Sequence, residues 1–292
     1  MARFAEAIVD GILGGAVYAL MAAGLTLIFG VLDIINIAQG ILVVLAAYLS
    51  YALAVHLHLD PLLGLFITVP VMFLLGVFIE WAFIRRLRGR ERTAMSLLVS
   101  YAVAVIIEGA LYELFGSTPV AIQSGYLTST VHILGFYLPY IYLIGFGLAV
   151  VALAAIYLTL YRTTFGRSIR ATVQDKVAAR LIGINVDRIA TLTFGIGVAV
   201  TAAGGMVFGI TNPGFNPDTG YDLISRLLSI VILGGLGSIG GALAAAMFMV
   251  TAEEIVNIWQ PTWATAVYYA VLVIVLVVRP NGLFGKQAAR AQ

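Results

Sequence analysis

Cysteine is absent from the 292-residue chain, and charged residues make up only 10% of it. The missing cysteines exclude disulfides, thiol catalysis and cysteine-ligated metal sites. The scarcity of charge sets the chain apart from soluble domains, in which about a quarter of the residues are charged. The sequence also lacks the G-x-x-x-x-G-K-[ST] phosphate loop, so it carries no standard ATP-binding motif. Its net charge of +2 gives no indication of nucleic-acid binding.

Apolar residues dominate what remains, since 62% of the chain is hydrophobic. This share exceeds the roughly one half that is usual for a soluble domain, and it predicts a membrane protein. The length of 292 residues leaves room for about eight to ten spans of about 20 residues each. The sequence therefore predicts an all-α polytopic membrane protein with roughly 8–10 transmembrane or re-entrant helices. These helices are expected to form a single transmembrane domain over residues 1–292.

Arginine-rich loops give the predicted spans an orientation. Apolar runs predict spans at 8–29, 41–59, 62–84, 94–115, 189–210 and 262–278, with a further span ending near 161. Basic residues concentrate in Arg85–Arg92 and in Arg162–Arg188. Because cytoplasmic loops are enriched in lysine and arginine, both loops are expected in the cytoplasm. The C-terminus, with Arg279, Lys286 and Arg290, is expected there too, whereas the orientation of the N-terminus stays open.

Polar side chains interrupt the apolar sequence between the first two spans, in residues 31–40. Asp33, Asn36 and Gln39 are spaced three apart, so they share a face if the stretch is helical. Polar groups at membrane depth persist where they face protein or a water-filled path. Two interpretations stay open: the three side chains line a translocation path, or the stretch is a tight turn at the membrane surface.

A second interruption follows the short apolar run Leu223–Leu236, which contains Arg226. A helix of that length covers about 21 Å, less than the roughly 30 Å of a hydrocarbon core. A half-helix that ends in the glycine-rich stretch 234–241 explains both the short length and the charge. Interrupted spans in two halves of a chain are typical of transporters. The residues expected beside the path here are Gly234, Gly235, Gly237 and Ser238.

Three charged residues, Glu108, Arg226 and Glu253, fall inside predicted spans or close one of them. Charges within a membrane are costly and are often functional. They raise an alternative of a different class, an ion-coupled secondary transporter that uses them as a proton or ion relay. No group of residues has the spacing of a metal site, so no metal is expected.

The longest polar run, residues 162–188, is predicted to carry a short helix outside the bilayer. Asp175 can cap that helix and Gly183 can end it, while Asp187 is expected to cap the next span. The apolar face of the short helix consists of Ala178, Leu181 and Ile182. Because so short a helix is unstable alone in water, this face should dock. Its partner is either the chain's own membrane domain or a groove on another protein.

The run Val177–Gly183, VAARLIG, resembles the EAA loop of ABC importer permeases, which has two alanines and then a glycine four residues on. It departs from that motif because valine replaces the acidic first residue and the usual proline-containing end is missing. These losses, and the longer run Gly166–Phe194, resemble the LivH-type permeases of the branched-chain amino acid subclass. INIAQG at Ile35–Gly40 and GGLGSIGG at Gly234–Gly241 do so too, so the resemblance covers nearly the full chain.

The resemblance implies one membrane subunit of a pump. The chain would pair with a LivM-like second permease and two ATP-binding-cassette ATPases in a bacterial-type inner membrane, surrounded by lipid. It would receive branched-chain or other hydrophobic amino acids from an extracytoplasmic substrate-binding protein. A relative carrying urea or short amides is the alternative within the family. ATP and magnesium would be bound by the ATPases, so this chain would hold no cofactor and would not itself be an enzyme.

In that family the loop is a coupling helix that fits a cleft on the ATPase. Carried over to this sequence, its residues are Asp175, Lys176, Val177, Ala178, Ala179, Arg180, Leu181 and Gly183. The cleft is expected to need small residues. Ala179→Glu and Gly183→Leu should therefore spoil docking while folding survives.

Overall fold

The structure, a computed structural model, describes residues 2–87, 92–122, 130–133, 136–212, 214–280 and 282–284. Arg88, Arg90, Lys286 and Arg290, which contribute to the predicted orientation, lie outside these residues. The helices are α1 (Ala2–Leu32), α2 (Gln39–Leu57), α3 (Pro61–Ile79), the π-helical turn η1 (Glu80–Ile84), α4 (Arg92–Phe115), α6 (Tyr140–Arg162), α7 (Thr164–Gln174), α8 (Lys176–Leu181), α9 (Val186–Thr211), α10 (Thr219–Gly234), α11 (Ile239–Trp259) and α12 (Pro261–Val278). Strands β1 (Thr130–Ile133) and β2 (Phe136–Pro139) form an antiparallel hairpin.

Eight helices of the described chain are long and apolar enough to cross a membrane. The predicted all-α polytopic fold is confirmed, with the short hairpin as an addition. The predicted half-helix is also confirmed, because α10 has 16 residues and is not among the eight. Both predicted interruptions separate helices, the first between α1 and α2 and the second between α10 and α11.

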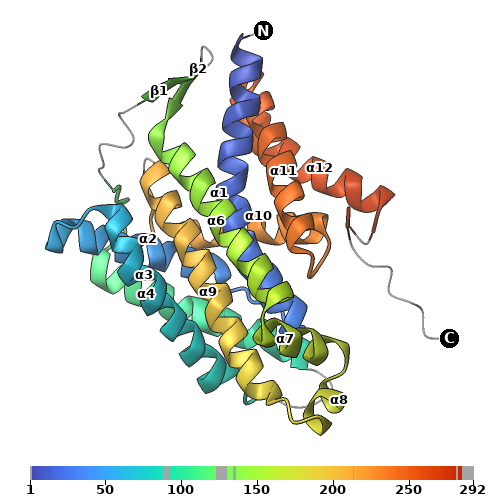
Figure 1. Ribbon diagram of the computed structural model, residues 1–292. Helices are drawn as coiled ribbons and strands as arrows, with labels where there is room; N and C mark the ends of the chain where they lie inside the picture. The colour runs from blue at the N-terminus through green and yellow to red at the C-terminus, as the bar shows by residue number, and fades with distance from the viewer. Residues whose placement is uncertain are drawn as a thin grey trace.

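Helices α1 and α9 form the buried centre of the bundle, and the other spans pack around them (Figure 1). Where the two helices cross, a methyl group on Gly24 would collide with the carbonyl oxygen of Gly197. Helix α1 also runs along α11, where a methyl group on Gly15 would lie 2.7 Å from the Cα of Met247. Helices in lipid associate through such close packing at small residues, because leaving lipid brings apolar side chains no hydrophobic gain.

The two ends of the bundle carry different elements. The N-terminus and the β1–β2 hairpin lie at one end, and α7 and α8 project from the opposite end (Figure 1). Helices α3 and α12 lie on the outside of the bundle, with exposed apolar side chains such as Phe66, Leu74, Val273 and Val277. Such faces suit contact with lipid tails.

Some boundaries differ from those expected. The sequence did not predict α7, and α11 continues beyond Glu253 to Trp259. The expectation that Asp187 caps the span after the polar run, α9, is wrong. Asn185 is the cap, and its side chain accepts a hydrogen bond from the amide of Arg188 at 3.0 Å. The aspartate lies in the first turn of α9, where its side chain is free to form ion pairs instead.

Candidate functional site

The first break, residues 33–38, begins where α1 ends. Asp33 has a left-handed backbone with φ of 58°, and no helix resumes until Gln39. Asp33 is exposed, whereas Asn36 and Gln39 are buried. The three polar residues therefore do not share one face, because the helix on which their spacing depends is absent.

Two of those side chains belong to a buried polar chain that reaches α9. The amide of Asn36 donates to Oε1 of Gln39 at 2.8 Å, and Nε2 of Gln39 donates to the hydroxyl of Thr201. That hydroxyl donates in turn to the carbonyl of Met21 at 3.1 Å. A threonine in an apolar span is common, so no sequence pattern points to Thr201.

Helix α4 supplies hydrogen bonds to the backbone that the first break leaves unpaired. The hydroxyl of Ser100 accepts from the amide of Ile37 at 3.1 Å, and the hydroxyl of Thr93 donates to the carbonyl of Asp33 at 3.3 Å. Irregular backbone at membrane depth requires such protein partners. The first break is thus held in place by its neighbours.

The second break, residues 235–238, follows α10. Gly235 and Gly237 have φ of 94° and 84°, which other residues rarely adopt. Ser238 then caps α11 by accepting from the amide of Gly241 at 3.1 Å. The amide of Leu283 donates to the carbonyl of Leu233 at 2.7 Å, so the segment after α12 returns to close the end of the half-helix.

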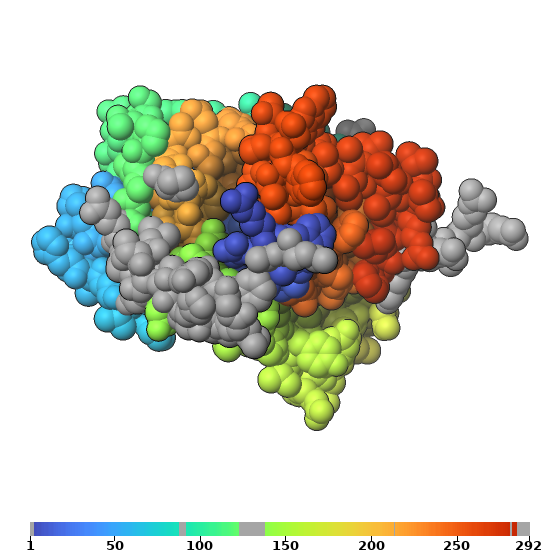
Figure 2. All heavy atoms as spheres, turned by 90° about the horizontal axis from the view of Figure 1, so that it is seen from above, coloured from blue at the N-terminus to red at the C-terminus, as the bar shows by residue number. Residues whose placement is uncertain are grey.

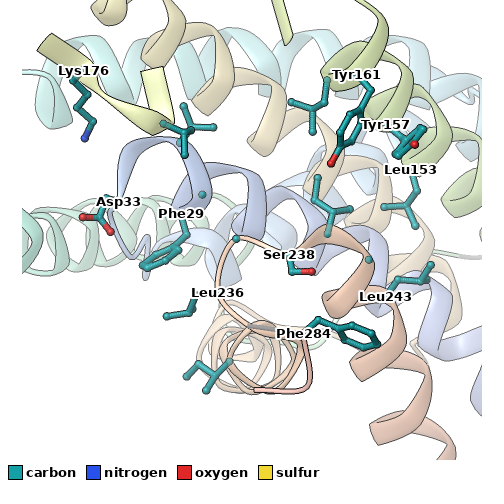
Figure 3. Close-up of a pocket in the computed structure, with 18 of the residues that line it drawn as sticks. Phe29, Asp33, Leu153, Tyr157, Tyr161, Lys176, Leu236, Ser238, Leu243 and Phe284 are labelled. Carbon is teal, nitrogen blue, oxygen red and sulfur yellow. The ribbon is translucent and has the colours of Figure 1, made fainter. Parts of the chain in front are cut away.

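The second break contacts the end of α1, just before the first break, although some 200 residues separate the two breaks in the sequence. A methyl group on Gly30, at the end of α1, would lie 3.3 Å from the Cα of Gly237. Beside this contact is an open cavity of about 1050 Å³, lined by α1, α6, the start of α8, the second break and the C-terminal segment (Figure 3). Of the expected path residues, Asp33, Gly237 and Ser238 line this cavity, and Asn36, Gln39, Gly234 and Gly235 do not.

The wall of this cavity is apolar with charges at one end. Aromatic and aliphatic side chains line most of it, among them Phe29, Tyr157 and Leu243 (Figure 3). Asp33 and Lys176 provide opposite charges on the same wall. Burial lowers the pKa of the Lys176 ammonium, as does the nearby charge of Arg92, while Asp33 acts in the opposite direction. A wall of this kind suits a small molecule that has both an apolar part and charged groups.

Helix α8 forms as the sequence predicts. The carboxylate of Asp175 accepts from the amides of Val177 at 2.7 Å and Ala178 at 3.0 Å, and Gly183 follows the helix with φ of 87°. Ala179 faces inward and is 2% exposed, so it supports α8 and is not available as a contact surface. The exposed apolar face consists of Val177, Ala178, Leu181 and Ile182. The chain's own membrane domain leaves this face uncovered.

Ion pairs join α8 to the bundle. Asp187 on α9 pairs with Arg180 on α8 at 3.3 Å and with Arg85, just after η1, at 3.5 Å. The hydroxyl of Thr191, one turn further along α9, donates to the buried carboxyl of Glu80 in η1. The exposed pairs contribute little stability each, but they set the position of α8 relative to α3 and α9. Glu80 does not stand out in the sequence, because it falls at the end of a long apolar run.

Only two of the three intramembrane charges pair with each other, and Glu108 has a different partner. Arg226 on α10 forms a bidentate pair with Glu253 on α11 at 2.6 and 2.8 Å, and its guanidinium lies 5.1 Å from the ring centre of Tyr268. Glu108 on α4 instead accepts from the hydroxyl of Tyr221 at 2.6 Å. The arrangement binds α10 to its neighbours, and among the described residues no hydrogen bond or ion pair joins Glu108 to Arg226 or Glu253.

A bundle of spanning helices with two breaks beside one cavity, and a short helix with an uncovered apolar face outside it, is typical of a membrane permease. The model of the family described as branched-chain amino acid transport system, permease component, matches residues 7–276, and the chain belongs to this family. The high-affinity branched-chain amino acid permease protein LivH of Escherichia coli is 28% identical, over 97% of this chain and 96% of that protein.

Two other similarities are partial or distant. The permease protein LivM of Salmonella typhimurium is 28% identical over 145 residues, which are 49% of this chain and 34% of that protein. A chain of PsaBC from Streptococcus pneumoniae, solved in complex with Fab, aligns with a TM-score of 0.50 at 13% identity, over 95% of this chain and 91% of that chain. This second likeness concerns the fold alone.

Proposed function

We propose that the chain is the membrane-spanning permease subunit of an ATP-binding-cassette importer in a bacterial-type inner membrane. Its substrates would be branched-chain or other hydrophobic amino acids. Membership of the family supports the substrate class. The lining of the cavity supports it too, because apolar walls with opposite charges at one end match an amino acid with an apolar side chain.

Helix α8 is the proposed contact with the ATPase. The observation that carries this proposal is its uncovered apolar face, on which Leu181 is 83% and Ile182 is 74% exposed. A six-residue helix cannot maintain such a face alone in water, so a partner groove is the natural cover. Asp175, Lys176 and Arg180 would stand at the edge of the contact, and Ala179 would support it from within.

In this proposal, a movement of α8 changes the shape of the cavity directly, because α8 contributes a residue to its lining. Lys176, the first residue of α8, lines the same cavity as Asp33 of the first break and Gly237 of the second break. A shift of α8 during ATP hydrolysis would therefore move one wall of the cavity. ATP and magnesium would be held by the partner ATPases.

The remaining partners follow from the same role. Similarity to LivM supports a second permease chain as a companion, and an extracytoplasmic binding protein would deliver substrate to the opposite end. The basic residues near α7 support a cytoplasmic position for α7, α8 and the C-terminus. The N-terminus, at the other end of the bundle (Figure 1), would then be extracytoplasmic.

The experiment that tests this function substitutes Leu181 with serine. Because the side chain is exposed, folding should be unchanged, and ATPase recovery with the purified chain should fall by about tenfold or more, as for a binding hot spot. Leu158→Ser, close to the end of α6, is the matched control, since that side chain is 54% exposed and is not among the described residues that line the cavity. Undiminished ATPase recovery with Leu181→Ser would exclude α8 as the docking helix.

A further inference from the structure

Carboxylates occur on the outer surface of α4 and α10, and that of Glu108 lies within a helix long and apolar enough to span a membrane. Glu108 is half-buried and lies about 10 Å from the end of α4 at Phe115, at a rise of about 1.5 Å per residue. Its partner Tyr221, on α10, is 42% exposed, and Asp222 and Ser225 next to it are exposed. A carboxylate inside the hydrocarbon core avoids lipid and faces protein or water.

These groups lie on facing parts of α4 and α10, with the exposed side chain of Val105 between Tyr101 and Glu108. On α4, Tyr101 and Glu108 are seven residues apart and share a face, and on α10 Tyr221 and Ser225 are four apart and share a face. The hydrogen bond from Tyr221 to Glu108 joins the two faces. We call the strip formed by Tyr101, Glu108, Tyr221, Asp222 and Ser225 the α4–α10 strip.

The outside of α3 has the opposite character. Its exposed side chains are apolar, including Phe66 at 75%, Leu74 at 64% and Phe78 at 52%. Viewed from the end that carries the N-terminus, the end of α4 (green) lies next to golden-orange atoms from the region where α9 ends and α10 begins, along one side of the molecule (Figure 2). The α4–α10 strip therefore belongs to one side of the bundle, and the outside of α3 suits lipid.

We infer that the α4–α10 strip is the contact surface for a second membrane-spanning permease chain. The inference rests on the proposed function and adds to it the surface at which the companion binds. The occupant must bring hydroxyl, amide or basic groups, because Tyr221 supplies only one donor to the Glu108 carboxylate and lipid tails can supply none to Glu108 or Asp222. A companion helix meets this need, and Tyr101 and Tyr221 add aromatic area of the kind enriched at protein interfaces.

The absence of cysteine makes the test direct, since every introduced thiol is unique in the chain. Single variants Tyr101→Cys and Ser225→Cys on the strip, with Phe66→Cys and Leu74→Cys on α3 as controls, are labelled with benzophenone maleimide in native membranes. After illumination, the strip variants should give an adduct with a second permease chain, identified by mass spectrometry. The α3 variants should give lipid adducts only.

Three results would overturn the inference. Lipid adducts at Tyr101→Cys and Ser225→Cys would make the strip a lipid surface, and no adduct of either kind would make it a water-filled surface. An adduct between two copies of this chain would replace the companion with a self-contact. If ATPases and a second permease still co-purify while the adducts arise only from α3, this inference fails and the proposed function stands.

Glu108 offers a second measurement. Glu108→Leu improves the match to lipid, so a lipid-facing position predicts unchanged or higher recovery of the companion. The inference predicts a several-fold fall in companion recovery with Glu108→Leu and a smaller fall with Glu108→Gln, which can still accept from Tyr221. The yield of this chain itself should stay the same in both variants.

Discussion

Gln39 is the residue through which the first break is attached to the centre of the bundle. Its side chain is fully buried, accepts from Asn36 and donates to Thr201 on α9. A buried amide without partners costs about 1–3 kcal/mol, so these bonds keep an irregular stretch in one conformation. Asn36 and Gln39 therefore stabilise the conformation of the first break, independently of any contact with substrate.

Thr201→Val is expected to lower the free energy of unfolding by about 1–3 kcal/mol, because it leaves Nε2 of Gln39 buried without an acceptor. The thermal unfolding midpoint of the purified chain in detergent measures this. Thr193→Val, on the same helix, is the matched control, since Thr193 is equally buried and its hydroxyl has no hydrogen-bond partner among the described residues. Equal midpoints for the two variants would remove Gln39 from this role.

At the scale of elements, α10 is the half-helix that needs outside support. Arg226 holds it to α11 through Glu253, and the hydroxyl of Tyr268 on α12 donates to the carbonyl of Arg226 at 3.3 Å. The side chains of the pair are 20% and 15% exposed. Because the pair is largely shielded from water, the attraction between Arg226 and Glu253 is strong, and either charge without the other would destabilise the fold.

Glu253→Gln should destabilise the chain by about 2–3 kcal/mol, since it leaves the Arg226 guanidinium partly buried without a counter-charge. Glu254→Gln is the neighbouring control. Its carboxylate is bonded only weakly, to Asn257 at 3.5 Å, so the expected change is within about 0.5 kcal/mol. Chemical unfolding of both variants in one detergent compares them. A similar loss for both would mean that the ion pair does not hold α10.

The structure of α8 predicts different effects for Ala179→Glu and Gly183→Leu, which the sequence alone predicts to act in the same way. Ala179→Glu puts a charge at an inward-facing position and should unfold α8 locally, so its effect on docking would be indirect. Gly183→Leu meets open space but a φ of 87°, and should cost only about 1–2 kcal/mol. Limited trypsin digestion measures this as much faster cleavage after Arg180 in Ala179→Glu than in Gly183→Leu. Equal cleavage would contradict the inward position of Ala179.

Much of the secondary structure could be predicted from the sequence. Long apolar runs, the short run around Arg226 and the glycine-rich stretch after it fix the spans and the second break, because lipid imposes length and polarity on each segment. Helix α7 was missed because its amphipathic pattern lies within a polar loop. The cap at Asn185 was missed because Asp187, two residues on, offers the same chemistry.

At the scale of the whole molecule, the breaks and α8 converge on one cavity. Residues from each line it, namely Asp33, Gly237 and Lys176. The sequence predicts each of the three segments, but it cannot predict that Gly30 touches Gly237, since that contact depends on how α1 and α11 pack. For the same reason, the pairing of Arg226 with Glu253 and the separation of Glu108 from them could only come from the structure.

The central claim is that ATP hydrolysis drives amino acid movement through this chain by way of α8. The most direct measurement is leucine uptake into proteoliposomes that contain the complete complex, with and without ATP, for the natural chain and for Leu181→Ser. We predict ATP-dependent uptake that Leu181→Ser reduces by about tenfold or more and that the control Leu158→Ser leaves in place. Uptake that needs no ATP, or that survives in Leu181→Ser, would contradict the claim.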